Sequence, residues 1–92
     1  MKIEFDPSKR DKTLIERGVD MARADEVLTG KTITVPDNRK DYGENRWITI
    51  GYLDGRMVVV AWTKRRNNFR IISMRKANDR EQSQYDTQLG GP

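Results

Sequence analysis

The clearest pattern along the chain is a pair of apolar runs separated by two turn residues. Residues 46–53 and 56–63 are rich in β-branched and aromatic side chains, and Asp54-Gly55 stands between them. Asp-Gly favours a two-residue hairpin turn because both central residues of that turn need positive φ. The pattern therefore predicts a β-hairpin over residues 46–63.

This turn also predicts how the two strands pair and which side chains share a face. Ile50 should face Val59 on one side of the sheet, and Trp47 should face Trp62 on the other. Both faces are then apolar along much of their length. We therefore expect other elements of the chain to cover at least part of each face.

Weaker patterns and helix-boundary residues predict the remaining elements. They are a strand over 2–5, helices over 7–17 and 21–28, strands over 32–35 and 69–74, a last helix after residue 78, and charged loops over 37–44 and 64–68. Asp6-Pro7 is a typical helix start, and Gly18 is a typical helix end. Asn78 and Glu81 have the spacing of a capping box.

The predicted order of elements is β-α-α-β-β-β-β-α, which indicates an α+β fold. We expect a single domain over residues 1–89 and a flexible tail over residues 90–92. Because the later strands follow one another directly, they favour an antiparallel sheet with the helices on one side. The inner stripe of the last helix should be Ala77, Tyr85 and Leu89.

Composition narrows the possible functions. The 92 residues include no Cys and no His, 35% of them are charged, and the formal net charge is +4. Without Cys there is no disulfide or thiol nucleophile, and the usual zinc ligands are missing. We therefore expect neither a metal nor a cofactor. The first residues lack an apolar secretory stretch and no run is long enough to span a membrane, so the expected location is the cytoplasm.

The positive charge is concentrated in one part of the chain. No Asp or Glu occurs between Gly55 and Asn78, and the cations of this stretch are Arg56, Lys64, Arg65, Arg66, Arg70, Arg75 and Lys76. Cations without interspersed carboxylates create a local potential that favours phosphate, so the expected partner is anionic, with RNA preferred. The alternative for Lys64-Arg65-Arg66 is a solvated hairpin tip.

Arg70 is a notable candidate because it lies within a strand, between Phe69 and Ile71. Such a cation is rarely fully buried without a partner. It can line the edge of a groove, or it can pair with Glu44 or Asp41. Further candidates stand near the ends of strands, where site residues are common: Arg75 and Lys76.

The loop before the hairpin offers further candidates with competing interpretations. Arg46 can serve the site or form a salt bridge with Glu44, and Tyr42 can place a phenol near the site or anchor the loop. Asp37, Asp41 and Glu44 form an acidic loop without a convincing metal-ligand arrangement.

The two tryptophans of the hairpin also allow more than one interpretation. Trp47 opposite Trp62 can stack bases, but aromatic cross-strand pairs more often stabilise a sheet or anchor a protein partner.

Taken in order, these pieces resemble the BrnT family, the toxin half of the BrnT/BrnA type II toxin–antitoxin system. The resemblance covers residues 2–86 and rests on Ile3-Glu4-Phe5-Asp6-Pro7-Ser8-Lys9, Gly18-Val19, Glu44-Asn45-Arg46-Trp47-Ile48-Thr49-Ile50-Gly51, Val58-Val59-Val60, Trp62-Thr63, Arg70-Ile71-Ile72-Ser73-Met74-Arg75-Lys76-Ala77, Glu81 and Tyr85. The resemblance is interrupted just before Gly18-Val19, where many relatives have a Lys-His pair and this chain has Glu16-Arg17.

The resemblance implies a RelE-like fold and a ribonuclease activity. It also implies neutralisation by a BrnA-like antitoxin of ribbon-helix-helix type, through which the complex binds DNA. The corresponding hypothesis is a metal-independent RNA endonuclease that inhibits growth. The alternative is a basic module that binds nucleic acid without cutting it.

We assign expected roles to the candidate residues on this hypothesis. The catalytic set is Arg70, Arg75, Glu44 and Arg46; the RNA-binding set is Lys64, Arg65, Arg66, Lys76 and Tyr42; and the antitoxin interface contains Trp47 and Trp62. Arginine forks would hold the phosphate while the ribose 2′-hydroxyl attacks it. Glu44 or Tyr42 would accept the proton, and Lys64 or Arg46 would assist.

Overall fold

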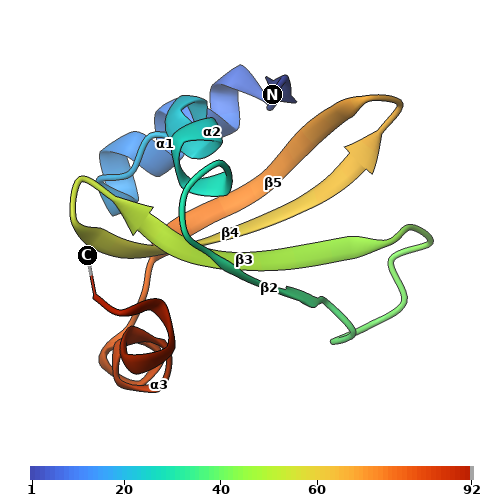
Figure 1. Cartoon of the computed structure of the whole chain (residues 1–92). Coiled ribbons are helices and arrows are strands. Elements are labelled where there is room, and N and C mark those ends of the chain that lie inside the picture. The colour runs from blue at the N-terminus through green and yellow to red at the C-terminus, as the bar shows by residue number, and fades with distance from the viewer. Residues whose placement is uncertain (92) are drawn as a thin grey trace.

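The computed structural model describes residues 1–91 and has an α+β fold (Figure 1). Its elements in chain order are β1 (Ile3–Glu4), α1 (Pro7–Arg17), the 3-10 helix η1 (Met21–Arg23), α2 (Ala24–Leu28), β2 (Ile33–Pro36), β3 (Arg46–Leu53), β4 (Arg56–Arg65), β5 (Asn68–Lys76) and α3 (Asp79–Leu89). The helix expected over 21–28 is therefore divided into η1 and α2. No helix among residues 1–91 has the length and apolar character needed to cross a membrane.

The five strands form one mixed sheet in the order β1-β5-β4-β3-β2. β2 through β5 pair antiparallel, but β1 pairs parallel to β5, with Ile3 opposite Phe69. The expectation of an antiparallel sheet is thus wrong at this edge. A parallel neighbour needs a long crossover connection, and all the chain between β1 and β5 supplies it.

The hairpin of β3 and β4 has the predicted register. Ile50 lies opposite Val59 and Trp47 lies opposite Trp62. Both turn residues have positive φ, 53° for Asp54 and 75° for Gly55. The local chemistry of the turn therefore sets the pairing of the two longest apolar runs.

The basic loop expected over 64–68 is mostly strand. β4 continues to Arg65 and β5 begins at Asn68, so the turn itself is only Arg66-Asn67. β5 also contains an irregularity, because Ala61 pairs with Ser73 whereas Trp62 pairs with Ile71. Ile72, between Ile71 and Ser73, is therefore the extra residue of a β-bulge. Such a bulge bends the strand and changes the direction of nearby side chains.

Helices cover both faces of the sheet, which corrects the expectation that they lie on one side. α1 and α2 lie over one face and α3 lies beneath the other (Figure 1). The core on the first face includes Val19, Met21, Ala24, Val27, Leu53, Val58, Val60, Ile71 and Met74. The core on the second includes Ile50, Met57, Val59, Ala77 and Leu89, with Tyr85 packed against it. The apolar character of both hairpin faces explains this arrangement.

The helix ends follow the predicted capping residues. The Asp6 side chain accepts hydrogen bonds from the first turn of α1, and Gly18 ends that helix with φ 69°. Asn78 and Glu81 form a capping box at the start of α3. The amides of Gly90 and Gly91 both donate to the Asp86 carbonyl, so they complete α3; Pro92, the last residue of the expected tail, lies outside the described residues.

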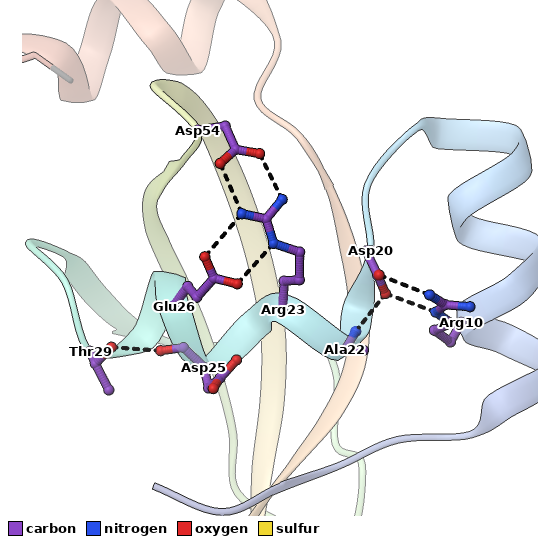
Figure 2. Close-up of polar contacts among 8 residues, drawn as sticks. All are labelled: Arg10, Asp20, Ala22, Arg23, Asp25, Glu26, Thr29 and Asp54. Atoms are coloured by element: carbon purple, nitrogen blue, oxygen red, sulfur yellow. Dashed lines mark hydrogen bonds and ion pairs between the residues drawn. The ribbon is translucent and has the colours of Figure 1, made fainter.

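Two arginines of the helical layer are neutralised by carboxylates (Figure 2). Arg10 donates to both oxygens of Asp20, at 2.8 and 2.9 Å. Arg23 binds Glu26 of α2 and also Asp54 of the β3–β4 turn. These pairs attach α1 to η1 and the helical layer to the hairpin, and they leave little free charge on either guanidinium.

Candidate functional site

A row of side chains crosses the sheet beyond the end that α3 covers. Arg46 pairs with Thr63, and Thr63 pairs with Arg70. Residues directly opposite each other in a sheet point to the same face. Strand alternation from Arg46 to Ile48 and Ile50 shows that this is the face of α3. Figure 1 shows α3 near the β3–β4 turn, while the other end of the strands extends past it.

A cavity of about 210 Å³ lies beside this row. Its lining consists of Asp6, Lys9, Glu44, Arg46, Arg65, Arg70, Ile71 and Ile72. Four of these residues are cations and two are carboxylates. Arg70 is half-buried, and within residues 1–91 it has neither an ion pair nor a side-chain hydrogen bond. The pairing with Glu44 or Asp41 that the sequence allowed is therefore not formed.

Glu44 instead lies between two other arginines. Its carboxylate accepts from Nε of Arg46 at 3.0 Å and lies 3.8 Å from Nη2 of Arg65. The guanidinium of Arg46 also stacks over the ring of Tyr42, 4.1 Å from its centre. Tyr42, Glu44 and Arg46 line a second cavity of about 240 Å³. Glu44 and Arg46 line both cavities, so the two cavities are adjacent at this ion pair. Among residues 1–91, no group of three or more acidic side chains is arranged to hold a metal ion.

The sequence placed Asp37 only in an acidic loop and did not indicate its burial or its pairing with Arg39. Its side chain is 1% exposed and accepts two hydrogen bonds of 2.8 Å from the guanidinium of Arg39. These bonds lower the pKa of Asp37 to about 2. Its amide donates to the Arg46 carbonyl. Asp37 thus anchors the loop that carries Tyr42 and Glu44. The sequence feature that could have indicated this role is the position of Asp37 directly after Pro36, which ends β2.

Arg75 lies on the same face but is not at the cavity. It is opposite Val59, and its guanidinium donates to both oxygens of Glu81, at 2.7 and 2.8 Å. The five residues from Arg70 to Arg75 correspond to roughly 16 Å of strand. The structure therefore gathers Arg46, Arg65 and Arg70, and it holds Arg75 at the start of α3.

The remaining cations expected to bind RNA are spread over two ends of the sheet. Lys64 and Arg66 are exposed at the β4–β5 tip, where Lys64 lies 5.5 Å from the centre of the Phe69 ring. Lys76 lines a different cavity together with Gly18 and residues of α1 and η1. Lys76 is therefore separated from the other members of the expected set.

The tryptophan pair lies on the opposite face from the Arg46–Arg70 row. Trp47 and Trp62 stack with ring centres 6.2 Å apart, and Trp62 contacts Phe69 edge-on at 5.0 Å. The indole N–H of Trp62 donates to Oγ1 of Thr49 at 2.8 Å. These contacts give both rings a role in packing the sheet, with Trp62 the more deeply integrated.

The fold and site together define a small α+β protein with a hollow whose charged lining is mainly cationic. A family model described as Ribonuclease toxin, BrnT, of type II toxin-antitoxin system matches residues 5–81. Because this match covers well over half of the 92 residues, the chain belongs to the BrnT family of ribonuclease toxins. The resemblance inferred from the sequence is confirmed. The family implies an RNA substrate and an antitoxin partner. A comparison with curated proteins found no match.

Proposed function

We propose that this protein is a metal-independent RNA endonuclease whose site is the cavity lined by Arg46, Arg65 and Arg70. The observation that carries the proposal is Arg70, a half-buried cation with no ion pair among residues 1–91, beside three other cations. An unpaired cation at a hollow is ready to bind an anion, since no carboxylate must first be displaced. The ribonuclease description of the family agrees with this chemistry.

In this proposal the arginines bind the phosphate to be cleaved. Arg70 and Arg46 are two strands apart in one row, so their guanidinium groups approach a single anion from two sides. Arginine presents a planar fork that forms paired hydrogen bonds with phosphate oxygens. These donors would stabilise the negative charge that grows on the phosphate during the reaction. Guanidinium groups would supply the charge that a metal ion supplies in other nucleases.

The proposed reaction is attack by the ribose 2′-oxygen on the adjacent phosphorus. The 2′-oxygen–phosphorus bond forms, the bond to the 5′-oxygen breaks, and the product is a 2′,3′-cyclic phosphate. Glu44 would accept the 2′-hydroxyl proton, and water would protonate the departing 5′-oxygen. A bound phosphate competes with Glu44 for Arg46 and Arg65, so substrate binding would release the carboxylate for this task.

The other expected assignments belong to the same proposal. Lys64 and Arg66 would bind RNA electrostatically at the β4–β5 tip, and Tyr42 would support Arg46 through its ring. The fold would be of RelE type. The partner would be a BrnA-like antitoxin with a ribbon-helix-helix domain that carries the complex to DNA, and Trp47 would contact this antitoxin. The site of action would be the cytoplasm.

The deciding experiment is cleavage of a labelled RNA by purified protein in the presence of a chelator. We expect the wild type to cleave and Arg70→Ala to lose most of its activity. Arg56→Ala is the matched control, because Arg56 is an exposed arginine about 30 Å from Arg65 along β4. Activity that the chelator abolishes and magnesium restores would contradict the metal-free mechanism. Full activity in Arg70→Ala would place the site elsewhere.

A further inference from the structure

The cations of α1 fall into two groups with different environments. Asp20 neutralises Arg10 on the side that faces η1 (Figure 2), and Asp11 also accepts a hydrogen bond from Arg10. Lys9 and Lys12 are exposed and have no ion pair within residues 1–91. Carboxylates therefore neutralise Arg10, whereas Lys9 and Lys12 of the same helix remain available to attract an anion.

The uncompensated cations line a hollow between α1 and β5. This hollow has a volume of about 300 Å³ and is lined by Lys9, Lys12, Thr13, Glu16, Arg17 and Ser73. Arg17 donates to the Met74 carbonyl at 3.3 Å, which holds its guanidinium against the strand without neutralising it. Three cations face a single carboxylate, Glu16, so the hollow has a net positive charge.

Lys9 connects this hollow to the proposed active site, because it lines both cavities. The sequence places Lys9 and Arg70 sixty-one positions apart; the parallel pairing of β1 with β5 brings the start of α1 beside Arg70. A cationic path thus runs from the Arg46–Arg70 row past Lys9 and along α1. Within the described residues 1–91, the path does not continue toward Arg10, which is neutralised by Asp20 and Asp11.

We propose that the hollow along α1 is a subsite for the RNA backbone next to the cleaved phosphate, an inference that rests on the proposed function. From Lys9 to Arg17 the helix rises about 12 Å. Stacked nucleotides of one strand rise about 3.4 Å each, so this length corresponds to roughly three to four nucleotides. Lysines bind phosphates as point charges, so the subsite adds affinity and positions the strand without selecting a base sequence.

The test is RNA binding measured by fluorescence anisotropy over a range of salt concentrations. The probes are 2′-O-methyl oligonucleotides of about four and about twelve nucleotides, which lack the attacking hydroxyl; only the longer one can fill both the cavity and the subsite. The variant is Lys12→Gln/Arg17→Gln, because these two cations line the hollow along α1 and do not line the proposed active site. For the longer probe we expect the slope of log K against log salt to fall by about 1.4, with Kd raised about tenfold near physiological salt. The shorter probe should bind as it does to the wild type.

The matched control is Lys31→Gln/Arg56→Gln, which removes two exposed cations at the opposite end of the sheet. It should leave the salt slope unchanged for both probes. Unchanged binding of the longer probe to the Lys12→Gln/Arg17→Gln variant would overturn the proposal. This holds even if the variant binds the antitoxin more weakly. An equal loss for both probes would overturn it too, because Lys12 and Arg17 would then act at the cleavage site. Either failure is independent of whether Arg70→Ala abolishes cleavage.

Discussion

The guanidinium of Arg75 is joined to the carboxylate of Glu81 by two hydrogen bonds, 2.7 and 2.8 Å long. The same carboxylate accepts from the Asn78 amide, which makes Arg75 part of the cap of α3. The hydrogen bonds from Arg75 lower the pKa of Glu81. This contact connects the end of the sheet to the helix that closes one face, and it bears directly on the role expected for Arg75.

We predict that Arg75→Ala reduces stability more than chemistry. Loss of the pair weakens the α3 cap, so the free energy of unfolding should fall by about 1 kcal/mol, as for a partly exposed charged contact at a helix start. Urea denaturation would measure the change, and cleavage at a temperature where both proteins are folded should differ little. Arg80→Ala is the matched control, because Arg80 is an exposed arginine on the same helix. A folded Arg75→Ala protein with no activity would return Arg75 to the catalytic set.

Arg70 should behave differently from Arg75. Arg70→Ala removes no ion pair, so folding should survive, while the cleavage rate should fall by roughly 10²–10³-fold, as when one transition-state donor is removed. Arg70→Lys should also cleave poorly because an ammonium cannot form the paired hydrogen bonds of a guanidinium. Single-turnover kinetics with circular dichroism as the folding check would measure both variants. An Arg70→Lys protein with wild-type rate would show that charge alone is needed there.

The β4–β5 tip should contribute affinity. Replacement of Lys64, Arg65 and Arg66 by Gln should raise the apparent KM for RNA and flatten its dependence on salt. Arg65 also lies 3.8 Å from Glu44, so a modest change in kcat is expected from this position alone. The single variants Lys64→Gln and Arg65→Gln separate the two effects in steady-state assays. A tip variant with normal KM and normal salt dependence would show that RNA does not contact this hairpin.

Asp37 should make stability depend on pH in the acid range. Its pKa in the folded protein is about 2, below the ordinary value for aspartate in an unfolded chain. The stabilisation is therefore fully present above the unfolded value and is lost as pH falls toward 2. Asp37→Asn should lower the free energy of unfolding by about 1 to 2 kcal/mol near neutral pH, a discounted value because Arg39 is largely exposed.

The measurement for Asp37 is the urea midpoint at several pH values. The difference between wild type and Asp37→Asn should be largest above about pH 5 and should shrink by about pH 3. Asp41→Asn in the same loop is the matched control, since the Asp41 carboxylate is exposed. A constant difference across this range would mean that the variant acts through packing instead of charge.

Alanine variants of the two tryptophans should distinguish a role in binding the antitoxin from a role in folding. Trp62→Ala removes the contact with Phe69 and the hydrogen bond to Thr49, so it should cost about 2 to 4 kcal/mol of stability. Trp47→Ala should be milder for folding and is the better probe of a partner. If Trp47 anchors the antitoxin, calorimetric titration should show a loss above about 2 kcal/mol that persists at high salt. Unchanged binding by a folded Trp47→Ala protein would assign the ring to the sheet alone.

The amino-acid sequence by itself determined the features that local chemistry controls. Asp54-Gly55 set the β3–β4 register because these two residues tolerate the positive φ that the turn requires at both positions. Asp6 and Asn78 began their helices because each side chain satisfies free amides of the first turn. The cation-rich stretch also pointed to the anionic partner that the family implies. The turn and the helix caps depend on residues within a few positions of one another, and the cation-rich stretch is a property of one continuous segment.

Only the tertiary structure decided which of these residues meet. The β-bulge in β5 and the parallel pairing of β1 brought Arg70 beside Arg46 and Lys9, while Glu81 drew Arg75 away to α3. The face that α3 covers was decided in the same way. These outcomes depend on the packing of segments far apart in the chain, where the energies of competing registers are close and no short motif distinguishes them.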